Sequence, residues 1–176
     1  MPDLLIRIKK HTDGRASLTC ARADGTVTWQ RQEGAQAGFF PRHDLTHYAV
    51  ETTLPDRRAF YCLVAEGWDL RDFEPPYPRG RIPTDALGVE VIVGFLDVER
   101  GTGQPMSAAD FNEKARVYFE ERGTIAPARL TDMDLDRIRE AMLGLFAQWV
   151  AVAPGDMLEL RYDRPAALTP APATHP

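Results

Sequence analysis

The sequence predicts an α+β fold in which a mostly antiparallel sheet, made of three N-terminal strands and one C-terminal strand, packs against about five helices. Three observations predict it. Apolar and polar residues alternate in three short runs near the N-terminus, the composition then shifts to helix formers, and alternation returns once near the C-terminus. Alternation is the period of strands with one buried face, and a lone late strand needs the early ones as pairing partners.

The N-terminal strands are expected to form a hairpin meander. They are expected at residues 4–10, 16–22 and 26–32. Asp13-Gly14 and Asp24-Gly25 separate them, and each pair predicts a tight turn because glycine accepts the positive φ that such turns require. We expect the C-terminal strand, where Leu158, Leu160 and Tyr162 alternate with polar residues, to pair with this meander.

Prolines and glycines punctuate the region between the meander and the last strand and divide it into helices. The helices are expected near residues 43–54, 57–67, 84–99, 107–122 and 132–151. Ser107 and Thr131 are each followed three residues later by an aspartate, which is the pattern of a capped helix start. In the last helix, apolar residues recur at steps of three and four and predict one buried stripe.

The expected domain covers residues 1–164, the size of one compact unit. Residues 73–83 contain four prolines and predict an extended connector, and residues 165–176 predict a disordered tail. The helix at 84–99 is apolar around much of its circumference. Such a helix belongs either to the centre of a core or to a subunit interface, and the second case would make the protein a homodimer.

Composition argues against several classes of protein. The apolar run 86–96 contains Glu90 and is too short to span a membrane, so no membrane association is expected. The formal net charge is −5 and the 21 basic residues are scattered along the chain, so nucleic acid is not expected as a partner. Only two cysteines, Cys20 and Cys62, occur, and the N-terminus lacks a signal pattern; both features favour the cytoplasm.

One row of polar side chains suggests chemistry. His43, His47 and Glu51 follow one another at intervals of four residues, which places them along one side of a helix. Val50 and Leu54 share this side, so the row should be half buried. A half-buried imidazole needs a hydrogen-bond partner or a metal ion, because an unsatisfied buried polar group costs on the order of 1–3 kcal/mol.

Helix geometry limits how this row could bind a divalent metal ion. The rise from residue 43 to residue 51 is about 12 Å, so one ion would bind an i, i+4 pair rather than all three side chains. His43 and His47 have the spacing of the two histidines in H-E-x-x-H zinc sites, although Asp44 stands where the glutamate of that motif would be. A third ligand could come from another helix. Glu90 is the best candidate, because burying an unpaired carboxylate in so apolar a stretch costs free energy.

Each of these residues also has a structural interpretation. The histidines could bond to nearby backbone or carboxylate groups and stabilise the helix. Asp44, in the first turn of the expected helix, would cap free N–H groups and complement the helix dipole. Glu90 would form a salt bridge with an arginine or face solvent. Cys62 and Glu66 are also spaced by four residues, but a lone cysteine among aromatic residues is usually part of the core.

Two segments carry a resemblance to known proteins. His43-Asp-Leu-x-His47-x-x-Val-Glu51 and the following Ala59-Phe-Tyr-x-Leu-Val-Ala-x-Gly67 resemble an uncharacterised family of bacterial proteins that share the H-D-L-x-H-x-x-V-E signature. The resemblance covers residues 39–73. It implies a bacterial, cytoplasmic protein in which the residues of the signature form a unit, and it implies no activity.

Two functions remain as hypotheses. In the first, His43 and His47 bind a divalent metal ion with help from Glu51 or Glu90, and the site performs hydrolysis or proton transfer. In the second, the protein is a non-enzymatic binding or regulatory module. The row then stabilises the helices, and an exposed groove receives a partner or a small molecule. Metal dependence separates the two hypotheses.

Overall fold

The computed structural model describes residues 2–54, 58–123 and 129–165 and has the predicted α+β architecture. One antiparallel sheet has the strand order β3-β2-β1-β4. Its strands are β1 (Leu4–Lys10), β2 (Ala16–Arg22), β3 (Val27–Gln32) and β4 (Met157–Tyr162). The helices are α1 (Ala35–Thr53), α2 (Phe60–Ala65), α3 (Thr84–Thr102), α4 (Ala108–Glu120) and α5 (Asp132–Ala151), with a 3-10 turn, η1 (Leu70–Phe73).

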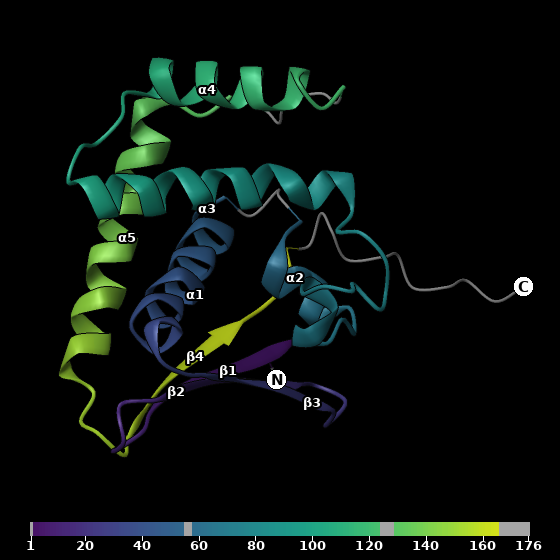
Figure 1. Ribbon diagram of the computed structural model, residues 1–176, viewed down its shortest axis with the longest axis vertical. Helices are drawn as coiled ribbons and strands as arrows, with labels where there is room; N and C mark the ends of the chain where they lie inside the picture. Colours follow the sequence, from purple (N-terminus) through teal and green to yellow (C-terminus); the bar gives the residue numbers. More distant parts are fainter. Residues whose placement is uncertain (1, 55–57, 124–128, 166–176) are drawn as a thin grey trace, which may run out of the picture.

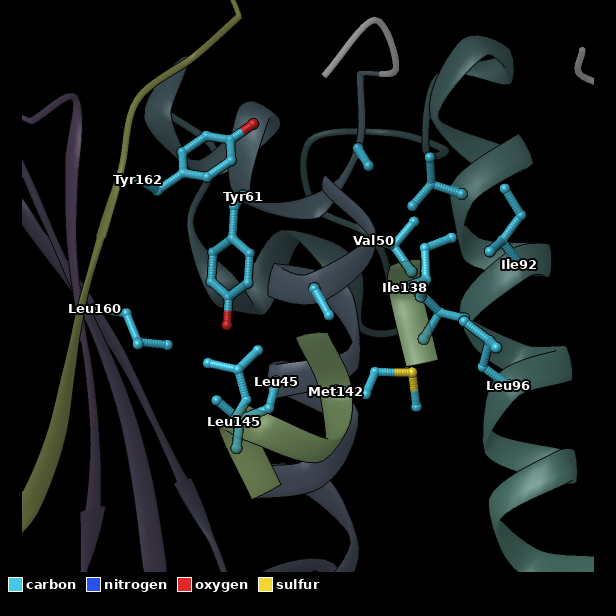
Figure 2. Packing of buried hydrophobic residues seen from close by; sticks show 14 of the residues in the cluster. Leu45, Val50, Tyr61, Ile92, Leu96, Ile138, Met142, Leu145, Leu160 and Tyr162 are labelled. Atoms are coloured by element: carbon cyan, nitrogen blue, oxygen red, sulfur yellow. The ribbon is translucent and has the colours of Figure 1, made fainter. Parts of the chain in front are cut away.

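All helices lie on one side of the sheet and form successive layers (Figure 1). α1 and α2 lie nearest the sheet, α3 packs on α1, α4 lies beyond α3, and α5 runs along the side of the stack back towards β4. Figure 2 shows α1 in the middle of the core: Leu45 lies on the side of the sheet residue Leu160, and Val50 lies on the side of α3. α1 is therefore the central helix of the protein.

The sheet presents its apolar residues to the helices, as the alternation predicts. Leu4, Ile6 and Ile8 of β1 are fully buried. Ile6 stands opposite Cys20 of β2 and Leu160 of β4, so one apolar row crosses three strands. The prediction that the C-terminal strand joins the meander is confirmed, because β4 pairs with β1 along its length.

The predicted starts of α4 and α5 are also confirmed. The backbone N–H of Asp110 donates to Ser107 Oγ at 3.1 Å, and that of Asp134 donates to Thr131 Oγ1 at the same distance. Thr131 and Asp134 form a full capping box, because the backbone N–H of Thr131 donates to Asp134 Oδ2. The predicted stripe of α5 is buried and consists of Leu135, Ile138, Met142, Leu145 and Trp149.

Two helix boundaries differ from the prediction. α1 begins at Ala35, eight residues before residue 43, because Gly34 at φ 56° turns the chain from β3 directly into the helix, which runs through Pro41. Glycines such as Gly34 and Gly38 favour loops, so the sequence had placed the start of the helix later. Asp44 is thus in the middle of α1 and buried, so the interpretation of Asp44 as an N-terminal cap is wrong. α2 is shorter than the predicted helix at 57–67.

Other expectations fall partly on residues that the structure does not describe. Residues 55–57, at the start of the expected second helix, and 166–176, nearly all of the expected tail, lie outside the described ranges. The expected connector at residues 73–83 is described in full and consists mostly of turns rather than extended backbone: the N–H groups of Tyr77 and Gly80 donate to the carbonyl oxygens of Glu74 and Tyr77.

The apolar circumference of α3 has an explanation within the chain. Val89, Ile92 and Leu96 belong to the main core, which includes α1, whereas Val91 packs with Ala115 and Phe119 of α4. α3 is therefore covered on two sides by its own chain, and its composition does not require a second copy. None of the helices in the described ranges is long and apolar enough to cross a membrane.

A lysine at the end of β1 closes the C-terminal end of α5. Lys10 Nζ donates to the carbonyl oxygens of Trp149, at 2.9 Å, and of Val152, at 2.7 Å, and it lies 4.7 Å from the centre of the Trp149 ring. The last carbonyls of a helix have no partner within the helix and carry partial negative charge, so a cation there is favourable. Lys10 thus fixes the first strand to the last helix.

We expect Lys10→Met to lower the free energy of unfolding by about 1–3 kcal/mol, because two carbonyl groups lose their charged donor. Urea unfolding followed by circular dichroism measures this change. Lys9→Met is the matched control: it removes the same charge one residue earlier, on the opposite face of the sheet, where the side chain of Lys9 makes no hydrogen bond with any described residue. An equal loss in both variants would contradict the role of Lys10.

Candidate functional site

The histidines of α1 face two carboxylates of α3. His43 Nδ1 lies 2.7 Å from Asp97 Oδ2, within hydrogen-bond distance, and His47 Nε2 lies 3.6 Å from Glu90 Oε2. His43 comes before His47 in the sequence, whereas its partner Asp97 comes after Glu90, so α1 and α3 run antiparallel where they pair. The two imidazole rings lie edge to face, with centroids 4.8 Å apart. The structure therefore brings Glu90, in a distant part of the sequence, next to His47.

His47 is the buried centre of the cluster, with 2% of its surface exposed. Its Nδ1 lies 3.8 Å from Glu51 Oε1 and has no hydrogen-bond partner among the described residues. Burial opposes protonation of the ring, but the negative charge of Glu90, followed by Glu51 and Asp44, outweighs burial and raises the pKa of His47 to about 9. His47 is consequently an imidazolium at neutral pH.

His43 is held in place by a second carboxylate and by aromatic packing. Asp97 bonds to His43 and also accepts from Arg100 Nη2 at 2.8 Å. Burial tends to raise the pKa of Asp97, but these two bonds outweigh it and lower the pKa. The His43 ring stacks on Phe39 with 5.4 Å between centroids. Its Nε2 makes no hydrogen bond within the described part of the chain, so one nitrogen is fixed and the other is open.

Glu51, the third member of the predicted row, is occupied by the backbone of α2. Its Oε1 accepts from the N–H of Tyr61 at 3.0 Å, and its Oε2 accepts from the N–H of Cys62 at 3.1 Å. The hydroxyl of Tyr162 also donates to Oε2, at 3.4 Å. The first N–H groups of a helix have no partner within it, so Glu51 satisfies the start of α2 from a neighbouring helix. Both of its oxygens have this structural use.

Asp44 is buried on the other side of α1, towards the sheet. Gln32 Nε2 of β3 donates to Asp44 Oδ2 at 2.7 Å, and the hydroxyl of Tyr61 donates to the backbone oxygen of Asp44 at 3.1 Å. Burial raises the pKa of Asp44 to about 6, although the bond from Gln32 and the nearby imidazoles act in the opposite direction. Asp44 is a buried acid that titrates near neutral pH.

Sequence reasoning missed Asp97 and Gln32. A signal for Asp97 was present, because it follows Glu90 by seven residues, or two helical turns, and so shares its side of α3. Gln32 has no such signal, since its bond to Asp44 depends on the chain turning at Gly34. Glu90 is 28% exposed along its side chain and makes no ion pair with an arginine of the described ranges.

The chemistry open to this cluster is limited. In the described ranges, no three histidine, cysteine, aspartate or glutamate side chains are arranged to hold a metal ion. Burial, followed by the charge of Glu66, raises the pKa of Cys62 to about 12, so this thiol is not a nucleophile at neutral pH. Among the described residues of the cluster, the carboxylate that no hydrogen bond occupies is that of Glu90, which lies 3.6 Å from His47 and is partly exposed.

No family model, curated protein or solved structure matches this chain. The resemblance of residues 39–73 to an uncharacterised bacterial family therefore stays a prediction.

The pKa of His47 predicts how stability changes with pH. Its pKa is about 6.5 in the unfolded chain and about 9 when folded, so the folded state binds the proton more tightly. The stabilisation is complete below pH 6.5 and is lost as the pH rises through 9. We expect the free energy of unfolding to fall by up to about 3 kcal/mol between these limits.

Urea unfolding at a series of pH values checks this expectation. In His47→Gln the decline above pH 6.5 should disappear, because glutamine does not titrate. His11→Gln is the control, since His11 bonds to Ser17 near the β1–β2 turn, far from the carboxylates of α3. A decline of the same steepness in His47→Gln would show that another group causes the pH dependence.

Proposed function

We propose that this protein is a non-enzymatic binding module that receives an anionic partner on the outer face of its sheet, with the histidine row in a structural role. The observation that carries the proposal is the charge of this outer face, meaning the side of the sheet turned away from the helices. Four basic side chains and one acidic side chain point outward there, although the chain as a whole has a net charge of −5. They are Arg7, Lys9, Arg31, Arg161 and Glu159.

The structural role of the row follows from the hydrogen bonds that its glutamate and the neighbouring aspartates make. Glu51 bonds to α2, Asp97 bonds to His43 and Arg100, and Asp44 bonds to Gln32. Removing one partner of a buried charge is strongly destabilising, because the other charge is left without compensation. These contacts join α1 to α2, α3 and β3, so a structural role accounts for these buried polar residues.

The outer face is open and its cations are partly free. No described helix covers it, and Figure 1 shows every helix on the other side. Arg7 pairs with Glu159 at 3.0 Å, and Arg31 lies 3.8 Å from Glu33 at the edge of the sheet. The side chains of Lys9 and Arg161 make no hydrogen bond or ion pair within the described ranges. Unpaired cations on an acidic protein attract an anionic partner through the local field rather than through net charge.

The triple variant Lys9→Gln/Arg31→Gln/Arg161→Gln tests the proposal. We expect the wild type to bind immobilised heparin at low ionic strength and the triple variant to elute at clearly lower salt, because fewer counterions are released. The control Arg116→Gln/Arg122→Gln/Arg137→Gln removes the same charge from α4, its C-terminal end and α5, and should elute like the wild type. Weak retention of the wild type, or equal shifts in both variants, would contradict the proposal.

A specific observation favours a divalent metal site as a second candidate function. His47 Nε2 and Glu90 Oε2, 3.6 Å apart, are too far for a hydrogen bond yet close to the separation of about 3.3 Å between two ligands of a tetrahedral zinc ion. His43 has its Nδ1 fixed by Asp97, as in metal sites where a carboxylate orients a histidine ligand. The ligands would be His43, His47 and Glu90, with Glu51 excluded because it is bonded to α2. The three side chains do not converge in the structure and would have to rotate to bind one ion.

Isothermal titration with zinc and manganese, together with elemental analysis, tests this second candidate. Binding of one ion that is lost in Glu90→Ala and in His43→Ala would support it, because both residues are partly exposed and their loss should leave the fold intact. Glu159→Ala is the control, since it removes a carboxylate of the outer face. Binding that survives in Glu90→Ala, or no binding in the wild type, would contradict a metal site in this cluster.

A further inference from the structure

A large aromatic side chain stands uncovered on the outer face. Trp29 lies in the middle of β3 and is 62% exposed, whereas Trp68 and Trp149 are each 8% exposed. Among the described residues, no aromatic ring or cation stacks on Trp29. An exposed indole offers a flat, rigid surface on which a planar group can stack, and it gains more than other side chains when a ligand covers it.

The strand beside Trp29 leaves room for such a ligand. The outward side chains of β2 are all short and are Ser17, Thr19 and Ala21. Thr19 stands directly opposite Trp29 on one side and Arg7 on the other. Since adjacent strands are about 4.8 Å apart, the indole and the guanidinium belong to strands separated by roughly 10 Å, with only a threonine between them.

Cations border this space on more than one side. In the neighbouring row across the sheet, Ser17 stands between Arg31 of β3 and Lys9 of β1. A planar group over Thr19 would thus have an aromatic ring on one flank, Arg7 on the other, and two further cations one row away. The basic residues that are scattered in the sequence gather here because alternate residues of different strands share one face.

We propose that the outer face binds single-stranded nucleic acid, with bases stacked on Trp29 and phosphates paired with Lys9 and Arg31. This inference rests on the proposed function and names its partner. Stacking on aromatic rings inside a basic surface is how proteins bind single strands with little sequence preference. A duplex or an acidic protein segment would use the cations but would leave the indole without a stacking partner. The expectation from the sequence that nucleic acid is not a partner rested on the absence of a basic run.

Fluorescence anisotropy with a labelled oligothymidine of about 20 nucleotides, at low ionic strength, tests the inference. We expect Trp29→Ala to weaken binding at least about fivefold and Trp29→Phe to retain most of the affinity, because phenylalanine keeps a stacking surface. Val27→Ala is the control: Val27 is exposed on the same strand and face but has no ring. Its affinity should stay within about twofold of the wild type. Both substituted residues, Trp29 and Val27, are exposed in β3, so circular dichroism suffices to confirm folding.

Heparin and poly-glutamate serve as competitors of the same oligothymidine. They distinguish a failure of this inference from a failure of the proposed function. If both polyanions compete as well as unlabelled oligothymidine and Trp29→Ala binds normally, the inference is overturned while anion binding by the outer face stands. If poly-glutamate competes best, the partner is an acidic protein segment and the inference is again overturned. If neither oligothymidine nor heparin binds the wild type, the proposed function is overturned as well.

Discussion

The fold depends on pairing the ionisable side chains of one central helix. Asp44, His47 and Glu51 of α1 are between 1% and 4% exposed, and a buried charge without a partner costs several kcal/mol. Their partners come from three other elements: Gln32 from β3, the N–H groups at the start of α2, and Glu90 from α3. Apolar packing could tolerate small displacements of these elements, but the charges cannot, so they fix how each element sits on α1.

The same pairing explains why so short a helix as α2 exists. Six residues are too few to form a stable helix alone, because nucleation is costly and the first N–H groups lack acceptors. Glu51 supplies both acceptors from α1, and Tyr61, whose hydroxyl bonds back to Asp44, fixes the first turn of α2 against the core. The interior chemistry thus serves the architecture, while the outer face of the sheet stays free to meet a partner.

Local patterns predicted most of the fold, and contacts between distant segments account for what they missed. Alternation and Asp-Gly turns predicted β1–β3, and the hydroxyl caps predicted α4 and α5, because these signals lie within a few residues. The start of α1 was missed because Gly34 and Pro41 usually indicate loops. In the candidate site, spacing placed His43 and His47 together. The hydrogen bonds of Glu51 to the backbone of α2 and of His43 to Asp97 depend on which helices pack together. No pattern within a few residues of the sequence indicates that packing.

The position of β1 between β2 and β4 has a consequence for the order in which the protein folds during its synthesis. Leu4 pairs with Tyr162, so one edge of β1 has no partner until residues 157–162 have left the ribosome. Until then the nascent chain carries a hairpin sheet with an open edge and an apolar face, the features that chaperones recognise and that lead to aggregation. Contacts of such long sequence separation also fold slowly. Completion of the sheet therefore waits for the synthesis of β4, and truncation before residue 157 would leave β1 as a permanent edge.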